Sequence, residues 1–168
     1  MTKEEKTSVE DLYNFELSTG VVLRAKSIPP GVFLSIMGKN PPPDPPTYYD
    51  PIKDLSYTNV DDPGYMEKMK HHDSVQSKEM LYAMVIFGTE FVSKPKEVAS
   101  MTSNDWVAKL ELTGVKTYPQ NKQWRYLQWV LSVAIMNTDD FTVLSEKVGK
   151  LNGVSEADVE SAAKFPGN

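Results

Sequence analysis

The sequence predicts a mainly α protein, in which a helical domain follows an N-terminal β-hairpin and a proline-rich connector. Three observations support this fold class. Two short N-terminal runs alternate apolar with polar residues, eight of the 12 prolines lie between Pro29 and Pro51, and apolar residues recur at helical spacing after the prolines. We therefore expect four parts: a frayed or disordered N-terminus over 1–12, a hairpin and short helix over 13–40, a connector over 41–62 and a helical domain over 63–165.

The predicted hairpin comprises residues 13–17 and 21–25. Every second residue of each run is apolar, which is the period of a half-buried strand. Ser18-Thr19-Gly20 joins the runs, and Gly20 can supply the positive φ that a three-residue loop needs. A lone hairpin is marginal in water, so its apolar face must pack on another part of the chain.

A short apolar helix should follow the hairpin. Pro29-Pro30 ends the second strand because proline removes a ladder donor. The next residues, Val32, Phe33, Ile36 and Met37, have helical spacing, and Gly38 and Asn40 end the helix.

The connector begins with Pro41–Pro46, which can form neither a helix nor an interior strand and favours an extended polyproline path. Its second half carries more apolar material than a solvated linker does. We expect this half to dock on its own domain or on a partner. Its large apolar residues are Tyr48, Tyr49, Ile52, Leu55 and Tyr57.

The first long helix is expected from Gly64 towards Phe91, with Asp61 or Asp62 as its cap and Pro63 near its first turn. Its second half, 80–87, is apolar on every side and should be central to the core.

Further helices follow from their apolar spacing and their end signals. Thr102 or Ser103 should cap a helix over 106–112 that stops at Gly114, and another should run from Gln120 to Met136. Thr138 should cap the next helix, which carries Phe141, Leu144, Val148 and Leu151 on one face and stops at Asn152-Gly153. Ser155 and Asp158 form a capping box for a last short helix, before a frayed end at 166–168.

Composition excludes several classes of protein. The chain has no cysteine, so it has no disulfide framework, thiolate metal site or thiol nucleophile. A net charge of -5 and a pI near 5.1 argue against broad charge-driven nucleic-acid binding. No apolar run approaches the roughly 20 residues that span a bilayer, and the N-terminus shows no signal peptide. We expect a cytosolic protein that does not bind membranes.

Catalytic and metal-binding patterns are weak. His71, His72 and Asp73 follow Glu67 by one turn, but adjacent histidines point about 100° apart on a helix, and a solvated helix face explains this cluster better than a metal site. The sequence has no P-loop, nucleophile elbow or HExxH motif. The acidic pairs 61–62 and 139–140 precede helices, where capping explains them. We predict no enzyme, no catalytic or metal-binding residue and no cofactor.

Aromatic and basic residues cluster in one stretch, which could stack nucleic-acid bases. Burial of the tryptophans in the helical core is the favoured interpretation, because large aromatics at helical spacing are usually buried. The stretch comprises Trp124, Arg125, Tyr126 and Trp129, with Lys116 and Lys122 nearby.

Several segments together resemble the tail assembly chaperones of long-tailed, siphovirus-type bacteriophages. The first are the hairpin Phe15–Arg24, the helix entry Ser27-Ile28-Pro29-Pro30 and the proline run Asn40–Pro46. The others are the aromatic helix Trp124–Trp129 and the ending Leu151–Ser155. The resemblance covers most of the chain as a pattern and an order of segments, and it includes no catalytic signature.

The resemblance implies a non-enzymatic role in the host cytoplasm. Such chaperones coat the apolar helices of the tape measure protein, keep them soluble and yield to tail tube subunits. The expected binding surface combines the short helix with the connector aromatics, because these segments cannot form a core of their own. Its candidate residues are Phe33, Ile36, Met37, Tyr48 and Tyr49.

Two alternative functions remain open at this point. The protein could be a structural virion protein, such as a tail completion or head-tail joining subunit, whose proline segment docks on a neighbour. It could also be a small metal-dependent or nucleic-acid-processing enzyme, which bound divalent metal would reveal. Self-association into a homo-oligomer is also open.

Overall fold

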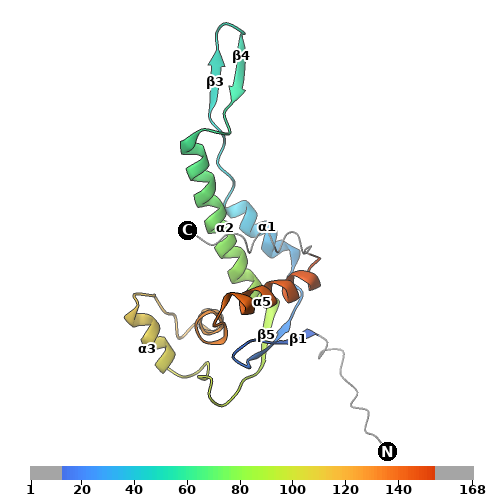
Figure 1. The fold of residues 1–168 in the computed structure, drawn as a ribbon, viewed down its shortest axis with the longest axis vertical. Helices are drawn as coiled ribbons and strands as arrows, with labels where there is room; N and C mark the ends of the chain where they lie inside the picture. The colour runs from blue at the N-terminus through green and yellow to red at the C-terminus, as the bar shows by residue number, and fades with distance from the viewer. Residues whose placement is uncertain (1–12, 154–168) are drawn as a thin grey trace, which may run out of the picture. The chain divides into compact units, whose positions relative to one another are not determined.

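The computed structural model describes residues 13–153 and shows a mixed α/β fold (Figure 1). Of these residues, 51% are helical and 14% lie in strands, which form two small antiparallel sheets. The prediction of a mainly α protein is therefore wrong. The segment expected to end the first long helix contains a strand, and the second half of the expected connector contains two strands. The expected N-terminal and C-terminal ends, including the Ser155 helix, lie outside the described residues.

The N-terminal hairpin is confirmed. Strand β1 (Asn14–Glu16) pairs antiparallel with β2 (Val22–Ala25), and Gly20 between them has a φ of 78°. Alternate side chains of the hairpin are buried, as the period of two predicts. The strands are shorter than expected, because Leu17 and Val21 lie outside them and close the turn with a hydrogen bond of 2.9 Å from the Leu17 amide to the Val21 carbonyl oxygen.

A third strand completes this sheet. Strand β5 (Thr89–Ser93) pairs antiparallel with β2, so the order is β1-β2-β5. The predicted helix to Phe91 is wrong at its end, since α2 (Pro63–Gly88) stops at Gly88. A Cβ on Gly88 would lie 2.6 Å from Val148 Cγ1, so the chain passes its neighbours closely there. The Thr89 hydroxyl then donates to the Val85 carbonyl oxygen, at the point where the helix becomes a strand.

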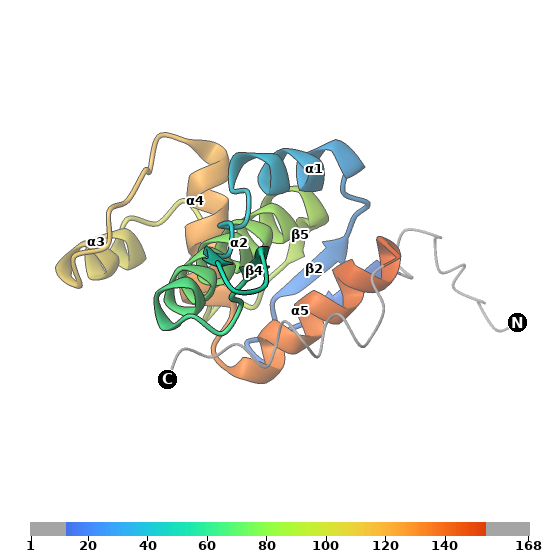
Figure 2. The ribbon, with the colours of Figure 1, turned by 90° about the horizontal axis from the view of Figure 1, so that it is seen from above.

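The remaining helices are present with different caps. Helix α3 (Asp105–Leu112) starts after Asn104, and α5 (Thr138–Leu151) starts after Asn137, whose side chain accepts a hydrogen bond from the Asp140 amide. The expected caps Ser103 and Thr138 are thus each off by one residue. Helix α4 (Lys122–Trp129) continues as the π-helix η2 (Val130–Ala134), which the sequence pattern did not indicate. Helix α5 contacts β1 and β2 and covers the sheet (Figure 2).

The chain divides into two compact units. We call Met1–Pro29 with Tyr82–Asn168 the core unit, and Pro30–Leu81 the insert. Every hydrophobic residue that is buried within 13–153 belongs to the core unit, with the indole of Trp129 fully enclosed. The apolar stretch 80–87 is less central than predicted, because only Ala83 and Val85 in it are buried and Phe87 is 45% exposed.

The insert contains a second hairpin. Helix α1 (Pro30–Lys39) is confirmed, and the proline run 41–46 has no regular structure, as predicted. Strands β3 (Thr47–Asp50) and β4 (Leu55–Thr58) then pair with each other, so the second half of the expected connector forms a hairpin that the sequence did not lead us to predict. Asp62, one of the two expected caps, accepts a hydrogen bond from the Tyr65 amide at the start of α2.

Candidate functional site

The insert has no buried residue, although the structure describes all of Pro30–Leu81. It nevertheless carries large apolar side chains that are 52% to 94% exposed. These eight residues are Leu34, Met37, Tyr48, Tyr49, Ile52, Leu55, Val60 and Met66. Large apolar side chains that stay exposed on a unit without a buried residue are typical of surfaces that a partner covers, so the insert is the candidate partner-binding part of the chain.

The predicted site residues fall into two groups. On α1, Phe33 and Ile36 are half-buried, whereas Met37 is 52% exposed. Leu34, which the sequence analysis did not single out, is 68% exposed and lies one turn before Met37. The exposed apolar face of α1 is therefore formed by Leu34 and Met37.

Tyr48 and Tyr49 lie on β3 and are 57% and 58% exposed. Figure 1 shows the β3–β4 hairpin beyond the first turn of α2, away from α1. The structure thus does not bring the two predicted groups together, and the insert offers two apolar surfaces.

One face of the β3–β4 hairpin is aromatic. Tyr48 and Tyr57 are directly opposite in the strand register, and their rings stack with centroids 5.6 Å apart. The Lys53 ammonium lies 5.8 Å from the Tyr57 ring centroid. Since period 2 places Leu55 on the face of Tyr57, this side of the hairpin is an aromatic and apolar surface with the Lys53 cation over one ring.

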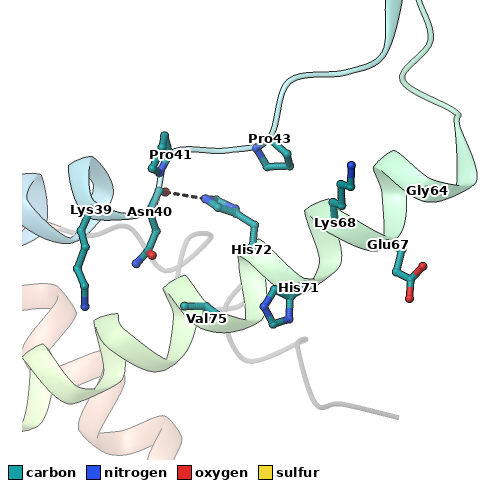
Figure 3. A pocket seen from close by; sticks show the side chains of 10 residues that line it. All are labelled: Lys39, Asn40, Pro41, Pro43, Gly64, Glu67, Lys68, His71, His72 and Val75. Carbon is teal, nitrogen blue, oxygen red and sulfur yellow. Dashed lines mark hydrogen bonds between the residues drawn. The ribbon is translucent and has the colours of Figure 1, made fainter.

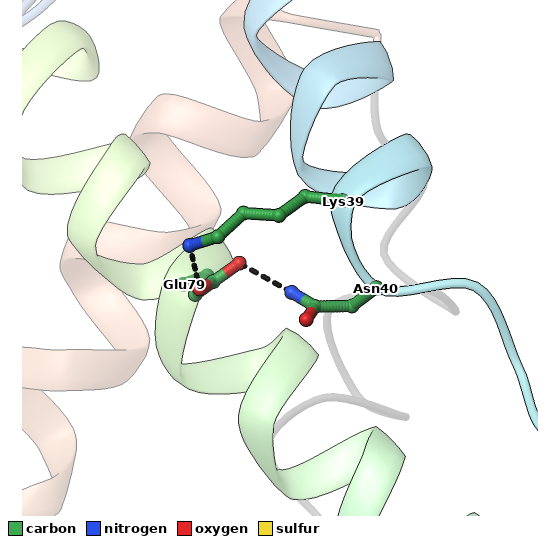
Figure 4. Close-up of polar contacts among 3 residues, drawn as sticks. All are labelled: Lys39, Asn40 and Glu79. Atoms are coloured by element: carbon green, nitrogen blue, oxygen red, sulfur yellow. Dashed lines mark hydrogen bonds and ion pairs between the residues drawn. The ribbon is translucent and has the colours of Figure 1, made fainter.

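A polar junction holds the end of α1 to α2. Glu79 accepts hydrogen bonds from Lys39 Nζ at 2.7 Å and from Asn40 Nδ2 at 2.6 Å (Figure 4). His72 lies over the Asn40 carbonyl oxygen, with 2.9 Å between that oxygen and Nε2 (Figure 3). An open groove of about 700 Å³ runs along this junction, between the proline run and α2.

The histidine cluster is not arranged as a metal site. Both ring nitrogens of His72 already have hydrogen-bond partners. Nε2 contacts the Asn40 carbonyl oxygen, and Nδ1 lies 3.0 Å from the Asp73 carboxylate. Within 13–153, no three histidine or acidic side chains are placed to hold one ion.

The aromatic stretch is mainly structural. Trp129 is fully buried and donates from Nε1 to the Ala99 carbonyl oxygen at 2.9 Å. The Tyr126 hydroxyl is 2.7 Å from the Thr89 hydroxyl, and burial raises the pKa of Tyr126 to about 12. Arg125 donates to the carbonyl oxygens of Met101, Ser103 and Pro119, so it fixes loops. Only Trp124, at 36%, is exposed among the aromatics of this stretch, and burial of Trp129 agrees with the favoured interpretation.

Asp140 has a structural role that the sequence analysis missed. Its carboxylate accepts hydrogen bonds from the Ser18 amide at 2.6 Å, the Ser18 hydroxyl at 2.7 Å and the Met136 amide at 3.0 Å. Burial would raise the pKa of Asp140, but the hydrogen bonds from Met136 and Ser18 outweigh it and lower the pKa below its usual value. The charged acid ties the hairpin turn to the start of α5.

Asp140→Asn should therefore cost about 2–3 kcal/mol of unfolding free energy at neutral pH, because charged hydrogen bonds are lost. A depressed folded pKa stabilises the fold above the unfolded value near 3.8, and this stabilisation is lost as pH falls through the folded pKa. The wild type should lose stability over that acidic range, and the variant should show a flatter dependence in urea unfolding. Asp139→Asn is the control, since the carboxylate of Asp139 is next to Asp140 in the sequence but is exposed. An equal loss in both variants would contradict the assignment.

None of the helices within 13–153 has the length and apolar character to cross a bilayer. No family model, curated protein or solved structure matches the chain.

Proposed function

We propose that the protein is a non-enzymatic tail assembly chaperone of a long-tailed phage, which binds apolar helices of the tape measure protein in the host cytoplasm and keeps them soluble. The observation that supports this proposal is the insert, which exposes eight large apolar side chains and buries none. A domain of this composition gains stability by covering that surface with a partner. The resemblance described above names the partner class, which includes tape measure protein and tail tube protein.

The two surfaces of the insert suit an apolar helix. Leu34 and Met37 present flexible aliphatic side chains, and thioether groups adapt to varied partners. Tyr48 and Tyr57 supply rigid aromatic area at low conformational cost. The same insert also exposes acidic and basic side chains on α2, which favours reversible binding over aggregation. They include Glu67, Lys68 and Lys70, all exposed.

Co-expression with the tape measure protein of the same phage tests the proposal. We expect the Leu34→Asp, Met37→Asp, Tyr48→Asp triple variant to lower the soluble fraction of tape measure protein at least about tenfold, because apolar contacts of this size contribute more than 1.4 kcal/mol. Leu112→Asp is the matched control, since Leu112 is 88% exposed but lies on α3 of the core unit. A triple variant that stays folded and solubilises as well as the wild type would refute this surface.

A structural virion protein is the second candidate function. The observation that favours it is the two-stranded β3–β4 sheet, whose outer edges are unpaired within the described residues. A neighbouring subunit could add a strand there, as a tail completion or head-tail joining subunit would require. Mass spectrometry of purified virions separates the two candidates, because a chaperone should be missing from the particle and a joining subunit present in fixed copy number.

A further inference from the structure

His72 is a residue of α2, and its side chain contacts Asn40, where the chain leaves α1 and enters the proline run. Its side chain is 12% exposed, so few water molecules can replace its protein partners. Both ring nitrogens face acceptors. Nε2 is 2.9 Å from the Asn40 carbonyl oxygen (Figure 3), and Nδ1 is 3.0 Å from Asp73 Oδ1. A neutral imidazole has one N–H, so only the imidazolium can donate to both.

The two acceptors compete for the proton of the neutral ring. The Asp73 carboxylate is charged and accepts a stronger hydrogen bond than a peptide carbonyl does. The neutral ring should therefore keep its proton on Nδ1. The lone pair of Nε2 then faces the lone pairs of the Asn40 carbonyl oxygen, so the hydrogen bond between these two atoms is replaced by a repulsion.

Other charged groups lie around this junction but do not replace His72. Lys39 of α1 is bound to Glu79, which also holds the Asn40 side chain, and neither bond depends on the histidine (Figure 4). Three further titratable side chains of α2 line the same groove, namely Glu67, Lys68 and His71. Asp73 remains the one charged group within the described residues that is hydrogen-bonded to the His72 ring.

We propose that His72 is a pH-sensitive latch, which holds the Asn40 carbonyl when protonated and releases it when neutral, so that the proline run and the β3–β4 hairpin change direction relative to α2. Hydrogen bonds to Asp73 and to Asn40 raise the pKa of His72 above 6.5, which moves the switch towards neutral pH. Pro41 follows directly, and the stiff proline run converts rotation at Asn40 into displacement of the hairpin. The latch is independent of the proposed function.

Spin-label distances across the insert test the latch in the full chain. The sequence has no cysteine, so Ile52→Cys in the hairpin loop and Lys70→Cys on α2 give a single labelled pair. We expect one narrow distance distribution at about pH 5.5 and a shifted or broader one at about pH 9, since these values bracket the ordinary imidazole pKa of about 6.5. Distributions that superimpose at both pH values would overturn the latch.

Two variants assign the effect to its residues. Asp73→Ala frees the neutral ring to donate from Nε2, so the distribution should stay narrow at both pH values. His71→Asn, one residue away and exposed, should respond like the wild type. Nitrogen-15 NMR of the neutral wild-type ring gives a separate readout, and a proton found on Nε2 in place of Nδ1 would refute the mechanism, as would a pH response that survives in Asp73→Ala.

Discussion

Trp129→Ala should lower the free energy of unfolding by about 3–5 kcal/mol, the cost expected for truncating a large buried aromatic. The indole is fully buried, its Nε1 donates to the Ala99 carbonyl oxygen, and its ring meets Phe91 edge to face with centroids 5.7 Å apart. Truncation would leave a cavity between α4 and β5 and an unpaired carbonyl. Urea unfolding followed by far-UV circular dichroism measures this loss of unfolding free energy. A variant that is already unfolded at 25 °C without urea would also agree with a loss of this size.

Trp124→Ala is the matched control on the same helix. Its ring is 36% exposed and contacts Tyr82 and Tyr118, so we expect a loss of about 1 kcal/mol. The loss of unfolding free energy in Trp129→Phe should fall between those of the two alanine variants, because phenylalanine keeps aromatic volume but cannot form the hydrogen bond. Equal losses at the two tryptophans would contradict the assignment of Trp129 as the central core residue.

Local sequence patterns were sufficient to predict some of the helices and strands. Alternation and Gly20 predicted the first hairpin, since the turn and both strands are neighbours in sequence. The end of α2 could not be predicted in this way. The apolar run through Phe87 and Phe91 suits a helix and a strand equally, and the partner that selects a strand, β2, is far away in the sequence.

The β3–β4 hairpin was missed for a different reason. Prolines before and after β3 suggested a connector, although they stand outside both strands. The four-residue loop closes with Asp54 at a φ of 52°, and the Asp50 side chain accepts from the Ile52 and Lys53 amides. Two β-prone runs around a short polar loop were the available signal.

The candidate site was predicted only in part. Sequence spacing identified α1 as apolar, but which of its faces stays exposed depends on contacts within the insert, so Leu34 was missed. Asp140 looked like a helix-capping acid, and it became an anchor for Ser18 only through the tertiary fold. Long-range contacts of this kind leave no local pattern in the sequence.

Excision of the insert should leave the core unit folded and abolish solubilisation of tape measure protein. All buried hydrophobic residues within 13–153 belong to the core unit, so the deletion removes no core side chain. The gap is short, because the Lys26 amide donates to the Gly88 carbonyl oxygen at 2.8 Å. Tyr82 lies six residues before Gly88, or about 9 Å along the helix.

A Gly/Ser linker of about eight residues in place of 30–81 has a mean span near 16 Å and can close that gap. The shortened chain should unfold cooperatively and lose less than about 2 kcal/mol, since Ala83 and Val85 still anchor the remaining helix. Co-expressed tape measure protein should then be insoluble. A shortened chain that cannot fold would show that the insert supports the core, and one that folds and still solubilises would place the binding surface on the core unit.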